Sequence, residues 1–239
     1  MPEEGIGLLR HEDILSYDEI TGFTRTAVKT GVTKVRITGG EPLVRKGITT
    51  LVEMISGIEG ITDLSMTTNG VLLKDFAGTL KNAGLNRINI SLDSINPERY
   101  KYLTRGGDIN KVLEGIEAAK VCSLHPVKIN CVISASKEEE DAREVADFCS
   151  KYGLEIRYIR QMDLMKGDFS TVEGGSGGDC AECSRLRLTA NGKLKPCLFN
   201  DLEFDIRQMG YLEAIQKAIG LKPESGTRNL NGGFYSIGG

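Results

Sequence analysis

Apolar and polar residues alternate along the first two thirds of the chain in a pattern that predicts strands separated by helices. Short runs rich in β-branched and apolar residues predict five strands, at residues 34–38, 64–67, 87–91, 127–132 and 155–159. Between them, apolar residues recur at helical spacing in two stripes: Ile20, Phe23, Ala27 and Val28, then Val112, Ile116, Ala119 and Val121. Glycines that mark helix ends precede three of the strands, at Gly31, Gly84 and Gly153.

Strands that alternate with helices predict parallel βαβ units, which two architectures can provide: a doubly wound open sheet or a (β/α) barrel. Polar groups follow nearly every strand, as in the segments 38–41, 67–70 and 91–94. A barrel gathers its chemistry at the C-terminal rim in this way, whereas an open sheet concentrates it at one switch point. The pattern therefore favours an α/β fold with a partial barrel. Because the chain opens in loop and helix, the first βα unit lacks its strand.

Composition and charge narrow the class of protein further. Of 239 residues, 40% are apolar and 26% charged, and the formal net charge is −3. This balance gives no electrostatic reason to expect a nucleic-acid partner. No apolar run approaches the roughly 20 residues that span a bilayer, and the acidic start lacks the apolar region of a secretory signal. We therefore expect a cytoplasmic protein without a membrane partner.

The composition of the sequence changes near residue 163. Glycine-rich stretches at residues 166–168 and 173–178 predict a flexible loop, and a short helix is expected at residues 211–219. We place a domain boundary near residue 165. This gives a partial barrel at residues 1–165 and a small C-terminal domain at residues 166–239.

Three of the six cysteines lie together in the C-terminal part. Cys180 and Cys183 are separated by two residues, and Cys197 follows a predicted hairpin whose turn is Asn191-Gly192. Three thiolates without a nearby histidine leave one metal position open, which favours a 4Fe–4S cluster with one unique iron. The alternative is a zinc site completed by a remote ligand such as His125 or Cys149.

Basic residues close to these cysteines predict an anion site. Arg185 and Arg187 follow Cys183 at alternate positions, so on a strand their forked donors point to the same side. Two further charges, Arg36 and Lys128, lie inside strand patterns. Each of these two either points into the barrel toward an anion or outward between the helices.

The turn after the first strand predicts a second ligand contact. Gly39 and Gly40 allow a ligand to approach the backbone closely, and Glu41 offers a carboxylate to an ammonium group.

Several segments taken together resemble the GTP 3′,8-cyclase family, which consists of radical S-adenosylmethionine (SAM) enzymes. These enzymes catalyse the first step of molybdenum cofactor (molybdopterin) biosynthesis, from GTP to (8S)-3′,8-cyclo-7,8-dihydroguanosine 5′-triphosphate. The resemblance covers nearly the whole chain. It is carried by residues 38–45, 67–70, 90–94, 180–189 and 195–199 and by the terminal Gly238-Gly239.

The resemblance implies a partial (β/α) barrel of the radical SAM type that lacks its first strand, with a small C-terminal iron–sulfur domain. Cys180, Cys183 and Cys197 would hold a 4Fe–4S cluster whose open iron binds the guanine of GTP. It further implies contacts to GTP from Arg36, Thr67, Lys128, Arg185 and Arg187. SAM would be bound by Gly39, Gly40, Glu41, Ser91 and Met162.

Further expectations follow from the same resemblance. The terminal Gly238-Gly239 would reach into the active site, and no catalytic side chain is identified. A reductant and the next enzyme of the pathway are expected as partners, and a homodimer is possible.

Three departures from the family pattern bear on activity. The C-x3-C-x2-C motif of the SAM-binding cluster is missing, and Cys122, Cys131 and Cys149 have the wrong spacing to replace it. We therefore expect this chain as given to be inactive in the radical step, with a second 4Fe–4S cluster only if an upstream segment exists. The segment between Met162 and Cys180 is several tens of residues shorter than usual, and Arg160 stands where the family usually has a glutamate.

Three interpretations remain. The first is a radical SAM GTP cyclase whose N-terminal segment has been lost, which the position of Met1 at an internal methionine of the family favours. The second is a non-catalytic iron–sulfur or nucleotide-binding module. The third is a related radical SAM enzyme with an auxiliary cluster and another substrate.

Overall fold

Five parallel strands form the central sheet of the computed structural model, which describes residues 10–230. They pair in the order in which they occur along the chain, so the strand order never reverses. A doubly wound sheet requires such a reversal at its switch point, so this alternative is wrong and the sheet is that of a partial barrel. The strands are β1 (Lys34–Ile37), β2 (Asp63–Thr68), β3 (Arg87–Ser91), β4 (Val127–Ile133) and β5 (Glu155–Arg160).

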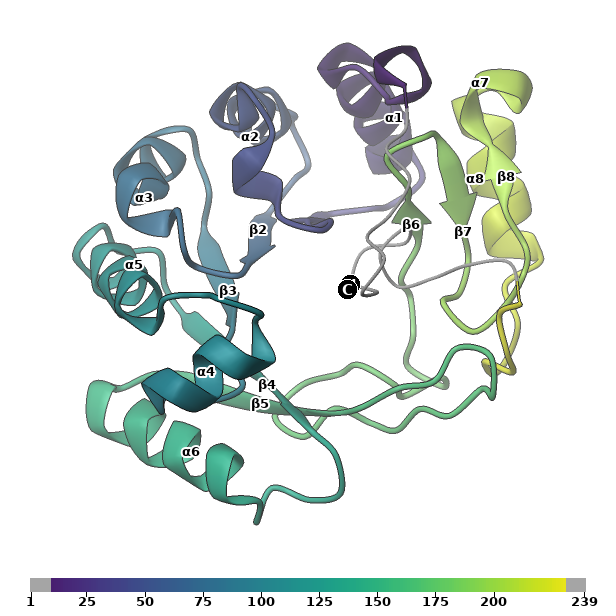
Figure 1. The fold of residues 1–239 in the computed structure, drawn as a ribbon. Coiled ribbons are helices and arrows are strands. Elements are labelled where there is room, and N and C mark those ends of the chain that lie inside the picture. The colour runs from purple at the N-terminus through teal and green to yellow at the C-terminus, as the bar shows by residue number, and fades with distance from the viewer. Residues whose placement is uncertain (1–9, 231–239) are drawn as a thin grey trace.

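Helices cover the outer face of this sheet, and Figure 1 shows them as an arc around the strands. The helix α1 begins with a capping box in which Ser16 and Glu19 bond each other's backbone amides. The helix α6 ends at Gly153, whose φ of 66° is left-handed. These helices are α1 (Tyr17–Lys29), α2 (Ile48–Ser56), α3 (Leu73–Asn82), α4 (Pro97–Leu103), α5 (Ile109–Val121) and α6 (Glu140–Tyr152).

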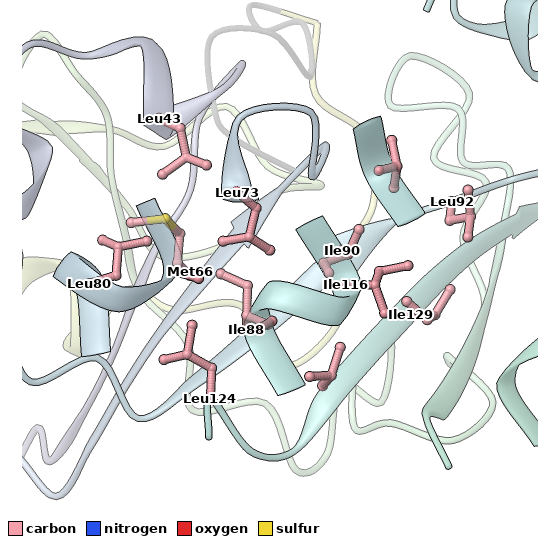
Figure 2. Close-up of a cluster of buried hydrophobic side chains, with 14 of the residues drawn as sticks. Leu43, Met66, Leu73, Leu80, Ile88, Ile90, Leu92, Ile116, Leu124 and Ile129 are labelled. Carbon is pink, nitrogen blue, oxygen red and sulfur yellow. The ribbon is translucent and has the colours of Figure 1, made fainter. Parts of the chain in front are cut away.

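The main hydrophobic core lies between the sheet and this arc of helices. Figure 2 shows Met66, Ile88 and Ile129 from the strands beside Leu73 and Ile116 from the helices. These side chains are buried because every second residue of each strand points to the helices. The predicted apolar stripe of α5 is confirmed except at its end. Val121 is 74% exposed, because it follows Ala119 by two residues and so projects from the opposite side of the helix.

The C-terminal part forms a second, smaller sheet with the antiparallel order β6-β7-β8. The predicted hairpin is present, and Gly192 in its turn has a φ of 84°. The predicted short helix is found as α8 (Tyr211–Gly220). The other elements are β6 (Arg187–Leu188), β7 (Lys193–Lys195), β8 (Phe204–Asp205), α7 (Ile206–Met209) and the 3-10 helices η1 (His11–Asp13) and η2 (Pro42–Val44).

Packing of α8 against α1 closes the molecule, and Figure 1 shows the two helices beside each other at the ends of the arc. Phe23 and Ala27 of α1 share a buried cluster with Ile215 and Ala218 of α8. The division into domains near residue 165 stays a prediction. This hydrophobic cluster nevertheless crosses the proposed boundary, since the first helix of the barrel belongs to it.

A polar contact reinforces this closure at the surface. Arg207 of α7 donates two hydrogen bonds to the Glu19 carboxylate, at 2.7 and 3.1 Å. Its guanidinium also donates to backbone carbonyls that precede α1. The hydrogen bonds from Arg207 and Ser16 hold the pKa of Glu19 at about 2.

None of the helices in the described part of the chain has the length and apolar character needed to cross a bilayer.

We predict that Ile215→Ala lowers the free energy of unfolding by about 2–5 kcal/mol, because it opens a cavity in the buried joint between α8 and α1. The matched control is Leu212→Ala on the same helix. Leu212 is 49% exposed, so its replacement should change stability by no more than about 0.5 kcal/mol. Urea unfolding followed by circular dichroism measures both, and equal effects would show that α8 does not dock on α1.

Candidate functional site

The inner face of the sheet is polar along its whole width, and we call the space that it faces the lumen. The lumen-facing side chains alternate along each strand with the buried apolar ones. A closed barrel normally fills this space with branched apolar residues, so a polar lumen indicates a ligand site. The inward set is Arg36, Ser65, Thr67, Arg87, Asn89, Ser91, Lys128, Asn130 and Arg157.

Arginines on three strands give the lumen a positive potential. Burial, then the charges of Arg157, Arg185 and Arg87, lower the pKa of Arg36 to about 10. Burial and the charge of Arg87 lower the pKa of Arg157 in the same way. Arg36 keeps contact with solvent although protein surrounds it, as expected of a group on a concave wall. Burial and neighbouring cations thus destabilise the charges of Arg36 and Arg157, so an anion placed beside them would be bound strongly.

Several buried polar atoms on this wall have no hydrogen-bond partner within the described chain. They are Nη1 of Arg87, Nε of Arg157 and the side-chain oxygens of Asn89 and Asn130. An unsatisfied buried polar atom costs about 1–3 kcal/mol. Their concentration on one surface therefore marks the place where a ligand or ordered water completes the bonding.

Several of the lumen residues already have partners. Arg87 binds Asp63 through two parallel hydrogen bonds at 2.9 and 2.6 Å, and this pairing lowers the pKa of Asp63. Lys128, predicted to face an anion, forms an ion pair with Glu155 on the neighbouring strand. Thr67 lies opposite Asn89, whose amide contacts its hydroxyl at 3.5 Å.

The glycine-rich segment at residues 173–178 packs against the arginines. A Cβ on Gly175 would lie 3.4 Å from Nε of Arg157, and one on Gly177 would lie 3.2 Å from Nη1 of Arg185. Arg185 is anchored here by a hydrogen bond to Ser176 Oγ at 3.2 Å. The segment predicted as a flexible loop thus provides the closely fitted wall that positions two cations.

Arg185 and Arg187 lie together as predicted, although only Arg187 belongs to strand β6. Burial and the charge of Arg185 lower the pKa of Arg187. Because the charge of Arg185 also acts on Arg36 and Arg157, the C-terminal hairpin faces the same lumen as the sheet.

The turn after β1 forms part of the rim of the lumen. A Cβ on Gly39 or Gly40 would meet no atom within 4 Å, so the backbone is open to a ligand there. The Glu41 carboxylate accepts hydrogen bonds from Leu43, Thr68 and Asn69, at 3.0, 2.7 and 2.7 Å. Glu41 therefore ties the exits of β1 and β2 together. Its contact with an ammonium group stays a prediction.

Ser91 and Met162, the other predicted SAM contacts, lie on different surfaces of the rim. Ser91 is exposed at the carboxyl end of β3. Met162, two residues after β5, packs against a small cluster of Leu164, Leu198 and Phe199. Cys197 packs on the same cluster, so the carboxyl end of β5 and the cysteine region are neighbours.

The three C-terminal cysteines are free and half-buried on loops that flank the β6–β7 hairpin. Burial and Arg185 lower the pKa of Arg187, and the smaller opposing effects of Cys183 and Cys197 indicate that both thiols lie near its guanidinium. Within residues 10–230, no three Cys, His, Asp or Glu side chains converge tightly enough to hold a single metal ion. A 4Fe–4S cube takes its thiolates at separate corners. Three thiols beside a cation fit this group in donor chemistry.

Neither proposed fourth ligand of a zinc site lies with these cysteines. Cys149 is 1% exposed inside the main core, and burial raises the pKa of its thiol to about 12. His125 precedes β4, at the amino end of the sheet and away from the rim. The positions of His125 and Cys149 therefore give no support to a zinc site completed by either residue.

Arg160 does not face the lumen. It donates a hydrogen bond to the carbonyl of Ala135 at 2.7 Å and lines a cavity of about 390 Å³ outside the barrel. The walls of that cavity also include Tyr158, Lys137 and Glu173. An arginine at this position thus leaves the charge of the lumen unchanged.

Comparison with known proteins identifies the family. The family model described as "Radical SAM superfamily" matches residues 5–149. A protein of Thermodesulfovibrio yellowstonii named GTP 3′,8-cyclase is 40% identical over 278 positions, which cover 94% of this chain and 86% of that protein. The chain belongs to the GTP 3′,8-cyclase family of radical SAM enzymes.

Members of the GTP 3′,8-cyclase family also show that this chain is shorter within the matched region. The protein of that name from Alkaliphilus oremlandii is 36% identical over 293 positions, which cover 100% of this chain and 92% of that protein. Because 293 exceeds the 239 residues present, that relative contains residues within the matched span that this chain lacks. A shortening of several tens of residues agrees with the prediction, and its location before Cys180 stays a prediction.

Solved structures show the same fold at low identity. The structure titled "Native anSMEcpe with bound AdoMet" has a TM-score of 0.62 at 13% identity and covers 91% of this chain and 73% of that chain. Streptococcus suis SuiB has a TM-score of 0.55 at 20% identity and covers 62% of this chain and 34% of that chain. Both share the fold of the partial barrel.

The sequence predictions missed Arg87 and Arg157. Both are charged residues inside predicted strands, which is the criterion that singled out Arg36 and Lys128.

We predict that Arg157→Gln weakens binding of inorganic triphosphate at least about tenfold, because it removes a charge-assisted donor from the lumen. The free energy of unfolding should stay the same or rise, since one of several repelling cations is lost. Titration calorimetry and urea unfolding measure the two effects, with Arg25→Gln on the exposed side of α1 as the control. Unchanged triphosphate affinity would contradict the assignment.

Proposed function

We propose that the chain binds GTP in the lumen and acts in the GTP 3′,8-cyclase step of molybdenum cofactor biosynthesis. The observation that carries this proposal is the gathering of Arg36, Arg157 and Arg185 around a wall on which Arg87 Nη1 and Arg157 Nε are buried without a hydrogen-bond partner in the described chain. A triphosphate offers the charge and the acceptor oxygens that these groups require.

The phosphates would be bound by Arg36, Arg157 and Arg185, and Arg187 would hold the end of the nucleotide near the cysteines. Thr67 and Lys128 would add contacts from the middle of the sheet. The Lys128 ammonium has three donors, so it can keep its ion pair with Glu155 and still bind an anion. The lumen thus contributes orientation and charge compensation rather than an acid or a base.

SAM would bind along the open backbone of Gly39 and Gly40. Glu41 would orient this turn through its internal hydrogen bonds, and Ser91 and Met162 would complete the pocket. This arrangement would place SAM at the rim and GTP deeper in the lumen, which excludes water between them.

The C-terminal 4Fe–4S cluster would be held by Cys180, Cys183 and Cys197. When bound, such a cluster supplies an open iron to which a substrate atom coordinates. Arg187 beside Cys183 and Cys197 would offset the negative charge of the thiolates.

These 239 residues are proposed to bind the nucleotide without cleaving SAM. The sequence contains no C-x3-C-x2-C motif. Cys131 and Cys149 are buried in the core, and burial raises the pKa of each thiol to about 12, so neither is available as a thiolate ligand. The complete step also needs an electron donor and an enzyme that accepts the product, which we propose as partners.

We predict that the chain, reconstituted with iron and sulfide without oxygen, binds GTP but releases no 5′-deoxyadenosine from SAM after reduction with dithionite. Titration calorimetry measures GTP binding, and chromatography measures the 5′-deoxyadenosine released. A loaded cluster without GTP affinity would contradict GTP as the substrate and favour a radical SAM enzyme with another substrate. Release of 5′-deoxyadenosine would refute the proposal that these residues do not cleave SAM.

We further predict that Cys197→Ser abolishes iron uptake at the C-terminal site, because two thiolates cannot hold the cluster against chelators. The control is Cys122→Ser, at the end of α5 and outside the ligand set. Iron and sulfide per chain are measured after desalting. Equal iron content in the two variants would contradict the assignment of Cys197 as a cluster ligand.

A further inference from the structure

The segment after α8, residues 222–230, crosses the region that contains the three cysteines, and we call it the strap. Its backbone amides donate hydrogen bonds to groups on the elements that surround the cysteines. These bonds run from Gly226 to Cys180 Sγ (3.5 Å), from Thr227 to the Phe199 carbonyl (2.8 Å) and from Asn229 to the Leu164 carbonyl (2.8 Å).

Lys222, at the start of the strap, joins the two chain segments that present the cysteines. Its ammonium donates to the backbone carbonyl of Arg185 at 2.9 Å and to that of Pro196. Arg185 follows Cys183 by two residues, and Pro196 directly precedes Cys197. One side chain therefore links the Cys183 segment to the Cys197 segment just beyond the last pair of the β6–β7 ladder, which is Arg187 with Lys195.

The strap fits these segments closely enough to require glycine at two positions. A Cβ on Gly226 would lie 2.8 Å from Cβ of Phe199. A Cβ on Gly167 would lie 1.8 Å from the carbonyl oxygen of Thr227. Asn229 is buried and its side-chain amide donates to the Leu198 carbonyl at 2.9 Å. The strap is thus fixed to the cysteine region at Lys222, Gly226, Thr227 and Asn229.

We propose that Lys222 is a positioning residue for the C-terminal iron–sulfur site, and that the strap tunes the cluster. Lys222 holds the Cys183 and Cys197 segments together where they leave the β6–β7 ladder and puts a positive charge beside them, while the Gly226 amide donates a hydrogen bond to the sulfur of Cys180. A nearby cation and an N–H···S bond both stabilise the more negative, reduced form of a cluster. This inference rests on the proposed function only in taking the three cysteines as cluster ligands.

The first test compares Lys222→Met, which removes the charge and both hydrogen bonds, with Lys222→Arg, which keeps the charge and the donors. We expect the midpoint potential of the reconstituted cluster to become more negative in Lys222→Met and to remain near the wild-type value in Lys222→Arg. The control is Lys217→Met on the exposed side of α8, where Lys217 pairs with Glu213 at 2.9 Å. Redox titration followed by electron paramagnetic resonance reports only loaded clusters, so partial loading alone does not move the potential.

The second test uses the full chain without iron. We expect the Cys183 and Cys197 thiolates to react with iodoacetamide about tenfold faster in Lys222→Met than in the wild type in the pH-independent limit of the rate, because the two segments lose their shared ammonium. Comparing rates at that limit removes the effect that loss of the cation has on the thiolate fraction. Lys217→Met should leave both rates unchanged. The proposal would be overturned if Lys222→Met had the same midpoint potential and the same alkylation rates as the control Lys217→Met.

The two tests separate this proposal from the proposed function. Wild-type protein that takes up no cluster would refute the cluster assignment, and with it the tuning role. The alkylation rates would still decide whether Lys222 holds the two segments together.

Discussion

Repulsion among arginines on the inner face of the sheet is the constraint that organises this molecule. Arg36, Arg157 and Arg185 come from two strands and a distant loop, yet in addition to burial Arg157 and Arg185 both lower the pKa of Arg36, and Arg185 also lowers that of Arg157. An apolar lumen would pack better, so the fold gives up stability at this surface. The outer face offsets that cost through a continuous apolar core between the strands and the helices, which leaves the inner face free for a ligand.

The C-terminal part supports this arrangement from two directions. Its helix α8 packs on α1 and so closes the arc of helices. Its glycine-rich segment and hairpin bring Arg185 and Arg187 to the open side of the sheet. The same region contains the three cysteines, the strap and the small cluster under Met162. The cation set and the cysteine site are therefore parts of one packed unit, and a change in one alters the other.

Local patterns predicted the five strands of the sheet to within about a residue, because each strand's alternation of apolar and polar side chains lies within its own segment of the sequence. The hairpin at Asn191-Gly192 and the helix α8 were predicted for the same reason. The partners of α1 were not predictable, since nothing near Phe23 indicates Ile215. The lumen was predicted in part: Arg36 and Lys128 stand out as charges within strands, but the ion pair with Glu155 depends on strand register. Lys222 lies in a loop without any pattern, and only its position in the fold reveals its contacts.

The hydrogen-bonded ion pair between Glu19 and Arg207 has a consequence for the synthesis of the protein. The two residues are 188 positions apart in the chain. At a synthesis rate of roughly 5–20 residues per second, α1 leaves the ribosome about 10–40 s before α7 and α8 exist. During this interval the apolar stripe of α1 has no α8 to cover it, although the strands and helices that follow it can already pair. The first helix to be synthesised is therefore among the last to be fixed in place, and it is the element most exposed to chaperones and proteases in the nascent chain.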